Sequence, residues 1–362
     1  MKQLRVAVIG MGFAGRLHCE SYESLGEKAK IVVICDSNEE RAKNYAEMFN
    51  AEACTDYHQL LNRKDIDAID ICAPHHLHVQ LAVEAAKAGK HILCEKPIAI
   101  TVEEADKIID AAKKAGVTLM VAENHLFTPA HQKIKEIVDS GKVGRVFLVR
   151  AFEAATSELI MNPDPKDWRA NPKNQGMLLD MAVHKFAFLR WVLGDIDSVF
   201  AIREKLVVTT LAPNYDDTAL LIVKFKSGAV GEIVVTGGNP AGITNSTEVY
   251  GTDGTIMENH LWEKPVTYLS VTAPESNGEW ICPEVEHRPY PGYYNISFRN
   301  EVAHFVDCVL NEKKPEMTGE DGREAVRAVI AATKSAEIKR FVKVETPTAK
   351  AKAGKNGTSK KK

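Results

Sequence analysis

The sequence predicts a doubly wound parallel α/β sheet of the Rossmann type, followed by an open, mostly antiparallel β-sheet domain flanked by helices. Up to residue 122, apolar runs of strand type alternate with helical patterns, as in parallel sheets with right-handed crossovers. After about residue 197, strand-like runs follow one another without intervening helices. We therefore expect domains at residues 1–122 and 123–345, and a disordered basic tail at 346–362.

The first domain is expected to contain five parallel strands. Each is a short apolar run, and they lie at residues 6–9, 31–35, 67–73, 91–94 and 117–122. Helical patterns follow at residues 39–49, 56–62, 78–88 and 101–116, in addition to a first helix that begins at residue 13. Because ligands of such sheets bind beyond the carboxyl ends of the strands, the residues after each strand are the first candidates for a site.

The second domain combines helices with consecutive strands. Helical patterns are found at residues 129–140, 176–193, 297–311 and 320–340. Strand-like runs are found at residues 145–152, 197–205, 217–226, 229–236 and 247–256. If the outer face of this open sheet is apolar, another subunit must cover it. We therefore expect a homodimer or homotetramer that assembles through the sheet.

Three glycines follow the first strand at the spacing G-x-G-x-x-G. Gly10 permits a tight exit from the strand, Gly12 lets the backbone approach a pyrophosphate, and Gly15 lets the helix pack closely on the strand. The helix N-terminus, with Phe13 and Ala14, then offers free N–H groups and a partial positive charge to the phosphates. The alternative is a glycine-rich turn without a ligand. The preceding strand, and the acidic residue described next, favour a dinucleotide.

The second apolar run ends in Asp36, which follows Gly15 by 21 residues (36 − 15 = 21). At this distance an acidic residue accepts hydrogen bonds from an adenosine ribose. Its charge also repels a 2′-phosphate, and Ser37 rather than an arginine comes next. We therefore expect NAD as the cofactor, with NADP less favoured because Arg41 is the only nearby cation that could bind the extra phosphate.

Composition limits the partners. The chain has 362 residues and a net charge of −3, which gives no reason to expect nucleic acid or a membrane surface as a partner. Its seven cysteines form no C-x-x-C pair, as expected for a reduced cytoplasm. The chain enters a strand almost at once and contains no apolar run of bilayer length, so we expect a cytoplasmic protein without a signal peptide.

Three further residues are candidates for chemistry. Lys96 follows a strand and precedes Pro97, which holds it extended, and partial desolvation in the crevice is expected to lower the pKa of this lysine. Asp180 and His184 are four residues apart in an apolar helical stretch, so they share a face and need partners. A pair satisfied within the protein is the structural alternative. Because no nearby motif supplies a third ligand, we predict no metal site.

These stretches resemble the glucose–fructose oxidoreductase, inositol dehydrogenase and rhizopine-catabolism family (Gfo/Idh/MocA) over roughly residues 4–345. The resemblance rests on Gly10-Met-Gly-Phe-Ala-Gly-Arg-Leu-His18, Cys72-Ala-Pro-His-His-Leu-His78, Ala88-Gly-Lys-His-Ile-Leu-Cys-Glu-Lys-Pro97, Trp168-Arg169, Gly176-Met-Leu-Leu-Asp-Met-Ala-Val-His184 and Tyr250-Gly-Thr-Asp-Gly254. It implies that Lys96, Asp180 and His184 form the catalytic group. It also implies a dinucleotide site lined by Ala73, Pro74, His75, His78 and Glu95, with Trp168 and Arg169 near the nicotinamide. Glu123 and Asn124 follow the fifth strand, and we expect Asn124 to contact the cofactor there.

The residues and the resemblance together predict reversible, NAD-dependent oxidation of a secondary hydroxyl on a sugar, polyol or glycoside. His184 is expected to take the hydroxyl proton, Lys96 to stabilise the alkoxide, and Asp180 to orient the substrate. Three alternatives stay open: glycoside cleavage through transient oxidation, redox-neutral epimerisation or aldose–ketose transfer, and NAD sensing without catalysis. Of the other histidines, His18 is expected to be structural, whereas for His125 a structural role and contact with substrate are equally expected.

Overall fold

The computed structural model describes residues 3–155, 176–207, 216–240, 242, 244–288 and 292–345. The predicted site residues Trp168 and Arg169 and the predicted tail lie outside these ranges. The first half of the chain forms a six-stranded parallel sheet with the order β3-β2-β1-β4-β5-β6, as expected for a doubly wound fold. Its strands are β1 (Leu4–Ile9), β2 (Ala29–Cys35), β3 (Glu52–Cys54), β4 (Ala68–Ile71), β5 (His91–Glu95) and β6 (Leu119–Ala122).

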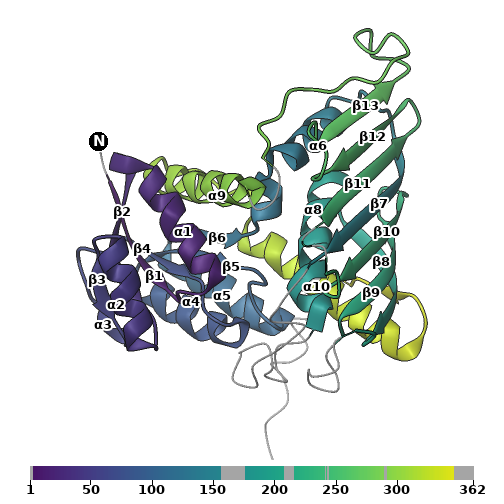
Figure 1. Cartoon of the computed structure of the whole chain (residues 1–362). Coiled ribbons are helices and arrows are strands. Elements are labelled where there is room, and N and C mark those ends of the chain that lie inside the picture. Colours follow the sequence, from purple (N-terminus) through teal and green to yellow (C-terminus); the bar gives the residue numbers. More distant parts are fainter. Residues whose placement is uncertain are drawn as a thin grey trace, which may run out of the picture.

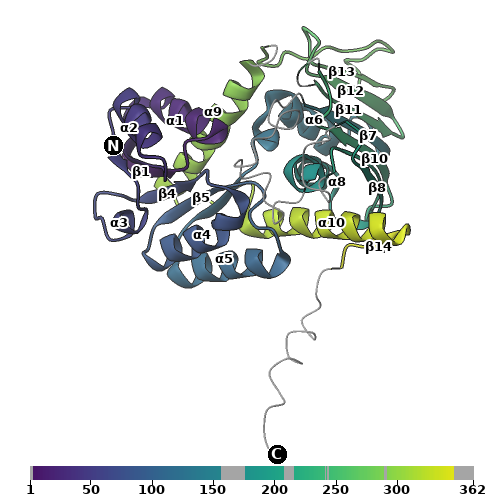
Figure 2. The ribbon, with the colours of Figure 1, turned by 60° about the horizontal axis from the view of Figure 1, so that its bottom comes forward.

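Helices cover both faces of this sheet. They are α1 (Phe13–Ser24), α2 (Glu39–Met48), α3 (His58–Leu61), α4 (His78–Lys87) and α5 (Val102–Ala115). Helices α1 and α2 lie on one face, and α4 and α5 on the other (Figure 2). Thr101 caps α5 in a reciprocal capping box with Glu104. The edge strand β3 was not predicted, because its three residues are largely exposed and show no apolar pattern.

The second half forms an eight-stranded sheet with the order β13-β12-β11-β7-β10-β9-β8-β14. Its strands are β7 (Val146–Ala154), β8 (Ile196–Glu204), β9 (Thr218–Phe225), β10 (Val230–Thr236), β11 (Thr244–Gly251), β12 (Gly254–Asn259), β13 (Val266–Ser270) and β14 (Val342–Lys343). Only β7 and β10 pair in parallel; the other neighbours are antiparallel. The single strand expected at 247–256 is wrong: the chain turns at Thr252-Asp253, and β12 returns beside β11.

Helices separate this sheet from the first domain (Figure 1). They are α6 (Pro129–Asp139), α8 (Val183–Leu193) and α10 (Gly319–Ile338), while α9 (Gly292–Leu310) packs against α1 of the first domain. The helix expected at 176–193 is present over that range, but it is not α-helical throughout. Its segment Leu178–Ala182 is a π-helix that leads into α8. Such wide turns are frequent at functional sites, and this one contains Asp180.

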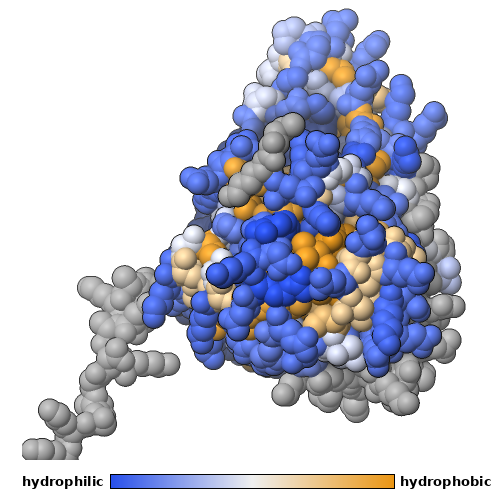
Figure 3. Space-filling model, turned by 90° about the vertical axis from the view of Figure 1, so that its left-hand side faces the viewer, coloured by the Kyte–Doolittle hydropathy of each residue, from blue (hydrophilic) through white to orange (hydrophobic). Residues whose placement is uncertain are grey.

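The surfaces of the two halves differ. On the side of the molecule that carries the first domain, hydrophilic residues cover most of the visible surface, with apolar areas between them (Figure 3). The outer face of the second sheet bears a row of apolar side chains that includes Ile202, Leu220 and Phe152, each exposed over more than a third of its surface. Among the described residues, none of the helices has the length and apolar character required to cross a membrane.

Candidate active site

The turn between β1 and α1 is shaped for an anion. Gly10 has a φ of +95°, and a Cβ there would lie 2.6 Å from the carbonyl oxygen of Cys72. A Cβ on Gly15 would lie 2.0 Å from the carbonyl oxygen of Gly10, whereas the space beside Gly12 is open within 4 Å. Within the described residues, no side chain caps the N-terminus of α1, and its first turn contains no acidic residue. Its N–H groups, including those of Phe13 and Ala14, are therefore left for a ligand.

Asp36 closes the same cradle from the end of β2. Its carboxylate accepts hydrogen bonds from the backbone N–H groups of Met11 (2.9 Å) and Asn38 (2.8 Å), so its position is fixed beside the glycine turn. Arg41 approaches it to 3.6 Å, and Ser37 is exposed. The carboxylate is thus held at the place where the sequence argument requires an acceptor for the ribose.

Lys96 lies just beyond β5, and its peptide bond to Pro97 is cis. Its ammonium group donates to the carbonyl oxygen of Asp180 (2.7 Å) and to the Asp180 carboxylate (3.0 Å). Burial acts to lower the pKa of Lys96, but the charges of Asp180 and Glu95 and the hydrogen bond to Asp180 outweigh it, so the pKa is raised. The expectation of a lowered pKa is therefore wrong, because desolvation was considered without the partner carboxylate.

His184 lies in the first turn of α8, and its charge and that of Lys96 both act on Glu95. Its Nδ1–H donates to the carboxylate of Glu123, which follows β6. The ring of His125 stacks on it at 4.1 Å with an interplanar angle of 9°. In the described part of the chain, no hydrogen bond engages Nε2 of His184. A carboxylate therefore fixes one nitrogen and leaves the other available.

Glu123 follows the fifth predicted strand, at the edge where ligands bind, but the sequence did not show that it pairs with His184. Asn124, the cofactor-binding candidate at the same strand end, donates from its side-chain amide to the Ser297 hydroxyl of α9. The fold also brings together Glu123, His125 and His184, a group that the sequence did not show. A ring nitrogen of each histidine and a carboxylate oxygen of Glu123 lie within 4.8 Å of one another.

The segment after β4 contains two buried histidines, His75 and His78. Both ring nitrogens of His78 lie within hydrogen-bond distance of backbone carbonyls, at 2.8 Å for Ala73 and 2.9 Å for Pro97. His78 therefore links this segment to the end of β5. His75, which follows Pro74, is buried, and its Nε2 lies 4.0 Å from the Asp180 carboxylate. Of the two histidines, His75 is the one beside the Lys96–Asp180 pair.

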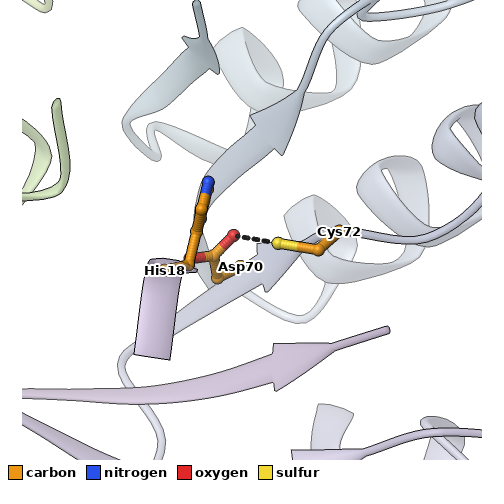
Figure 4. Close-up of side chains that lie close together, drawn as sticks. All are labelled: His18, Asp70 and Cys72. Carbon is orange, nitrogen blue, oxygen red and sulfur yellow. Dashed lines mark hydrogen bonds and ion pairs between the residues drawn. The ribbon is translucent and has the colours of Figure 1, made fainter. Parts of the chain in front are cut away.

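A charged network lies behind Lys96. His18 of α1 bonds to Asp70 (2.8 Å) and reaches Glu95 (3.2 Å), while the thiol of Cys72 bonds to Asp70 (Figure 4). Burial opposes a charge on His18, but the Asp70 carboxylate outweighs it and raises the pKa of the imidazole. Glu95 in turn accepts from the backbone N–H of Lys96. Nδ1 of His18 is thus paired within the protein, and the structural role of this residue stays a prediction.

A second polar layer lies between α8 and the inner face of the sheet. Lys185, which is fully buried, donates to Asn245 of β11 and lies 3.7 Å from Glu153 of β7. His125 is 2% exposed and has its Nε2 3.6 Å from the same Glu153. His125 therefore contacts His184 through its ring face and Glu153 of the second sheet through Nε2.

The described site residues fall into two groups. The cradle group comprises Gly10, Gly12, Phe13, Ala14, Gly15 and Asp36, with Ser37 exposed beside it. The crevice group comprises Lys96, Asp180, His184, His75 and Glu95, with Ala73, Pro74, His78 and Asn124 at its margins. The ends of strands in the first sheet and the segments that follow them supply these residues, except Asp180 and His184, which come from the second half of the chain.

Comparisons with known proteins match both halves of the chain. A family model described as an oxidoreductase family with an NAD-binding Rossmann fold matches residues 4–123. A second, described as the GFO/IDH/MocA C-terminal domain, matches residues 131–257. Myo-inositol 2-dehydrogenase of Thermotoga maritima is 31% identical, with coverage of 94% of this chain and 99% of its own.

A second relative has a solved counterpart of the same name. Levoglucosan dehydrogenase of Pseudarthrobacter phenanthrenivorans is 32% identical, with coverage of 72% of this chain and 74% of its own. A solved structure of a levoglucosan dehydrogenase in complex with NADH matches this structure with a TM-score of 0.87 and 26% identity. That match covers 96% of this chain and 100% of the other.

Proposed function

The chain belongs to the GFO/IDH/MocA oxidoreductase family and is an NAD-dependent sugar or polyol dehydrogenase, and from this premise we propose that it oxidises a secondary ring hydroxyl to a ketone, reversibly. The proposal rests on two groups that lie close to Glu95: the Lys96–Asp180 ion pair, and His184. Lys96 is held as a cation by Asp180, and His184 has Nδ1 bound to Glu123 and Nε2 available.

The residues of the cradle fit NAD. A pyrophosphate fits the turn because Gly10 and Gly15 leave no room for a Cβ beside the backbone. The N-terminus of α1 also has no side-chain cap within the described residues. Asp36 would bind the ribose hydroxyls. NAD, when bound, supplies the acceptor for the carbinol hydrogen and its electron pair. The remaining steps, binding the hydroxyl and moving its proton, belong to residues of the chain.

His184 is proposed as the base. A neutral imidazole whose Nδ1–H donates to Glu123 carries a lone pair on Nε2, the form that accepts a proton. Once Nε2 is protonated, the Glu123 carboxylate stabilises the imidazolium that results. The face-to-face contact with His125 restricts rotation of the ring, so Nε2 keeps its direction.

Lys96 is proposed to stabilise the alkoxide rather than to take the proton. Because its pKa is raised, it remains an ammonium group at neutral pH and can only donate. A preorganised cation at the oxygen on which charge develops lowers the barrier without reorganisation. Asp180 holds the ammonium through two contacts, which makes it an orienting residue for Lys96 and, we propose, for the substrate.

The substrate is proposed to be a cyclic, polyhydroxylated compound. The relatives are named for myo-inositol and levoglucosan, both rings with several secondary hydroxyls. A panel of cyclic polyols, aldoses and glycosides with NAD would test this, with NADH absorbance and product mass recorded together. We expect equimolar NADH and ketone with at least one ring compound. Product without NADH would favour the redox-neutral alternatives, and no product with any compound would contradict the proposal.

Assembly through the second sheet is also proposed. The register places Ile202 beside Leu220, Leu220 beside Val234, and Val234 beside Phe152, so one apolar row crosses four strands. Such a row on a solvent face is characteristic of a subunit interface. Light scattering should show a dimer or tetramer, and Leu220→Asp should dissociate it. A wild-type monomer at working concentration would contradict this proposal.

A further inference from the structure

A third cluster of potential ligands lies in the interior of the second domain, outside the catalytic crevice. It contains His131 of α6, Glu258 of β12, and His260, which follows β12. Their donor atoms lie within 4.8 Å of one another, and the three residues are 0%, 1% and 2% exposed. We propose that this cluster binds one divalent transition-metal ion of the zinc type.

The hydrogen bonding of His131 provides the first argument. Its Nδ1 lies 2.8 Å from the carbonyl oxygen of His125, and a carbonyl can only accept, so Nδ1 carries a proton. In the neutral ring, Nε2 therefore presents a lone pair. This arrangement, in which one nitrogen is fixed by a backbone carbonyl and the other is bare, is the one that orients a metal-ligating histidine.

The surroundings of that lone pair provide the second argument. Nε2 of His131 faces an oxygen of Glu258 at 3.9 Å, which is too long for a hydrogen bond even if the ring were protonated. Within the described residues, neither oxygen of Glu258 and neither nitrogen of His260 makes a hydrogen bond. Buried polar atoms are normally paired, so it is unusual that these nitrogen and oxygen atoms converge without a hydrogen bond, although Nε2 of His260 lies 2.9 Å from one Glu258 oxygen. A cation would satisfy them together.

The distances suit a small tetrahedral ion. Nε2 of His260 lies 2.9 Å from the other Glu258 oxygen. Two ligands on a tetrahedral zinc ion are about 3.4 Å apart, a value that lies between the 2.9 and 3.9 Å found here. Two imidazoles and one carboxylate are a zinc-type ligand set, whereas magnesium and calcium prefer oxygen ligands alone.

The other two clusters in the described residues are different. In the group of His18, Asp70 and Cys72, the carboxylate already binds both the imidazole and the thiol, as Figure 4 shows for the sulfur contact. In the group around His184, Nδ1 is bound to Glu123, and the two rings stack instead of pointing at one centre. Among the described residues, the cluster of His131, Glu258 and His260 is the one in which ring nitrogens and carboxylate oxygens converge without a hydrogen bond.

An ion at this position would join two layers of the second domain. His131 stacks on Phe188 of α8 at 4.0 Å, so the site would connect the helices to β12. Lys185, the nearby buried cation, is already balanced by Glu153 and Asn245 and does not need Glu258 as a partner. The proposed role is therefore structural, and the ion should stabilise the fold without entering the reaction.

The test uses the full-length protein, stripped of metal by a chelator and titrated with Zn²⁺ alone. We expect one ion bound per chain by calorimetry and a rise in melting temperature, because a ligand that binds only the folded state stabilises it. Co²⁺ in place of Zn²⁺ should give the visible absorption of a tetrahedral site. X-ray absorption at the zinc edge of the wild type should show two imidazoles and one carboxylate, which needs no variant.

Matched variants locate the ion. Glu258→Gln and His260→Gln should weaken Zn²⁺ binding by about tenfold or more, whereas His304→Gln, which removes a histidine of α9 outside the cluster, should not. His184→Ala should also retain the ion. The proposal is overturned if the wild type binds no Zn²⁺, if binding survives both cluster variants, or if binding is lost in His184→Ala instead.

Discussion

The end of β5 and the interior of the second domain each place a lysine beside carboxylates, but the two lysines have different surroundings. The side chain of Lys96 is 17% exposed and that of its partner Asp180 is 15% exposed. Lys185 is fully enclosed between Glu153 and Asn245. The ammonium group of Lys96 is partly accessible to a ligand, whereas that of Lys185 contacts only groups of the protein. Burial of a charge is therefore no guide to catalysis until its partners and its access are known.

The largest effect is expected in the interior. Lys185→Met should lower the free energy of unfolding by about 3–5 kcal/mol, because it leaves the Glu153 carboxylate buried without its cation. Urea denaturation followed by circular dichroism would measure this. The turnover of the folded fraction should fall far less than in the corresponding Lys96 variant. An unchanged unfolding free energy would show that Glu153 is neutral or otherwise paired, which would remove the contrast between the two lysines.

The next largest effect is expected in the crevice. Lys96→Met keeps most of the side-chain volume and removes the ammonium group, so kcat should fall by about 10²–10³-fold. The free energy of unfolding should change little, because the Asp180 carboxylate can reach water. Steady-state kinetics at saturating NAD, beside the same denaturation experiment, would separate the two quantities. Near-normal turnover in Lys96→Met would contradict the role proposed for this residue.

The charge of Lys96 can be tested by pH. Its ammonium group is surrounded by the carboxylates of Asp180, Glu95 and Glu123, with His75 near Asp180, and its pKa is raised above the ordinary 10.5. The folded protein therefore binds this proton more tightly than the unfolded chain. The resulting stabilisation is complete below pH 10.5 and is lost as the pH rises through the raised value.

Competitive labelling of amines, read by mass spectrometry across alkaline pH, would report the titration of Lys96 directly. We expect its midpoint above the ordinary lysine value of 10.5. A midpoint below 10.5 would mean that desolvation outweighs the carboxylates, as the sequence alone had suggested.

The two regions also differ in how far the sequence could predict them. The cradle was predictable because Gly10, Gly15 and Asp36 lie within one β–α–β unit, where local spacing fixes their relation. The bond between His184 and Glu123 spans 61 residues, and that between Lys185 and Asn245 spans 60. No local period relates such pairs, since the packing of α8 between the first domain and the sheet brings them together. The resemblance identified Lys96, Asp180 and His184 but not the groups that hold them, and the roles of all these residues stay predictions.

The smallest effect is expected at the cradle, where a single charge selects the cofactor. Asp36→Asn keeps the size of the side chain but removes the negative charge, and its single acceptor oxygen can serve only one of the N–H groups of Met11 and Asn38. A hydrogen bond to a charged group contributes about 1.5–3 kcal/mol, so the preference for NAD over NADP should fall by roughly tenfold or more. Arg41, now 3.6 Å from Asp36, would become free to bind the 2′-phosphate.

The double variant Asp36→Asn/Arg41→Ala tests this explanation. This variant should show no gain in NADP efficiency, because Arg41, the cation proposed to bind the 2′-phosphate, has been removed. Its NAD efficiency should stay lowered, because the Asp36 carboxylate is still absent. The ratio of kcat/KM for the two cofactors, measured with one substrate, is the readout. If Asp36→Asn leaves this ratio unchanged, the carboxylate only supports the backbone turn through Met11 and Asn38. The cradle would then resemble the interior of the second domain, where charges serve the fold alone.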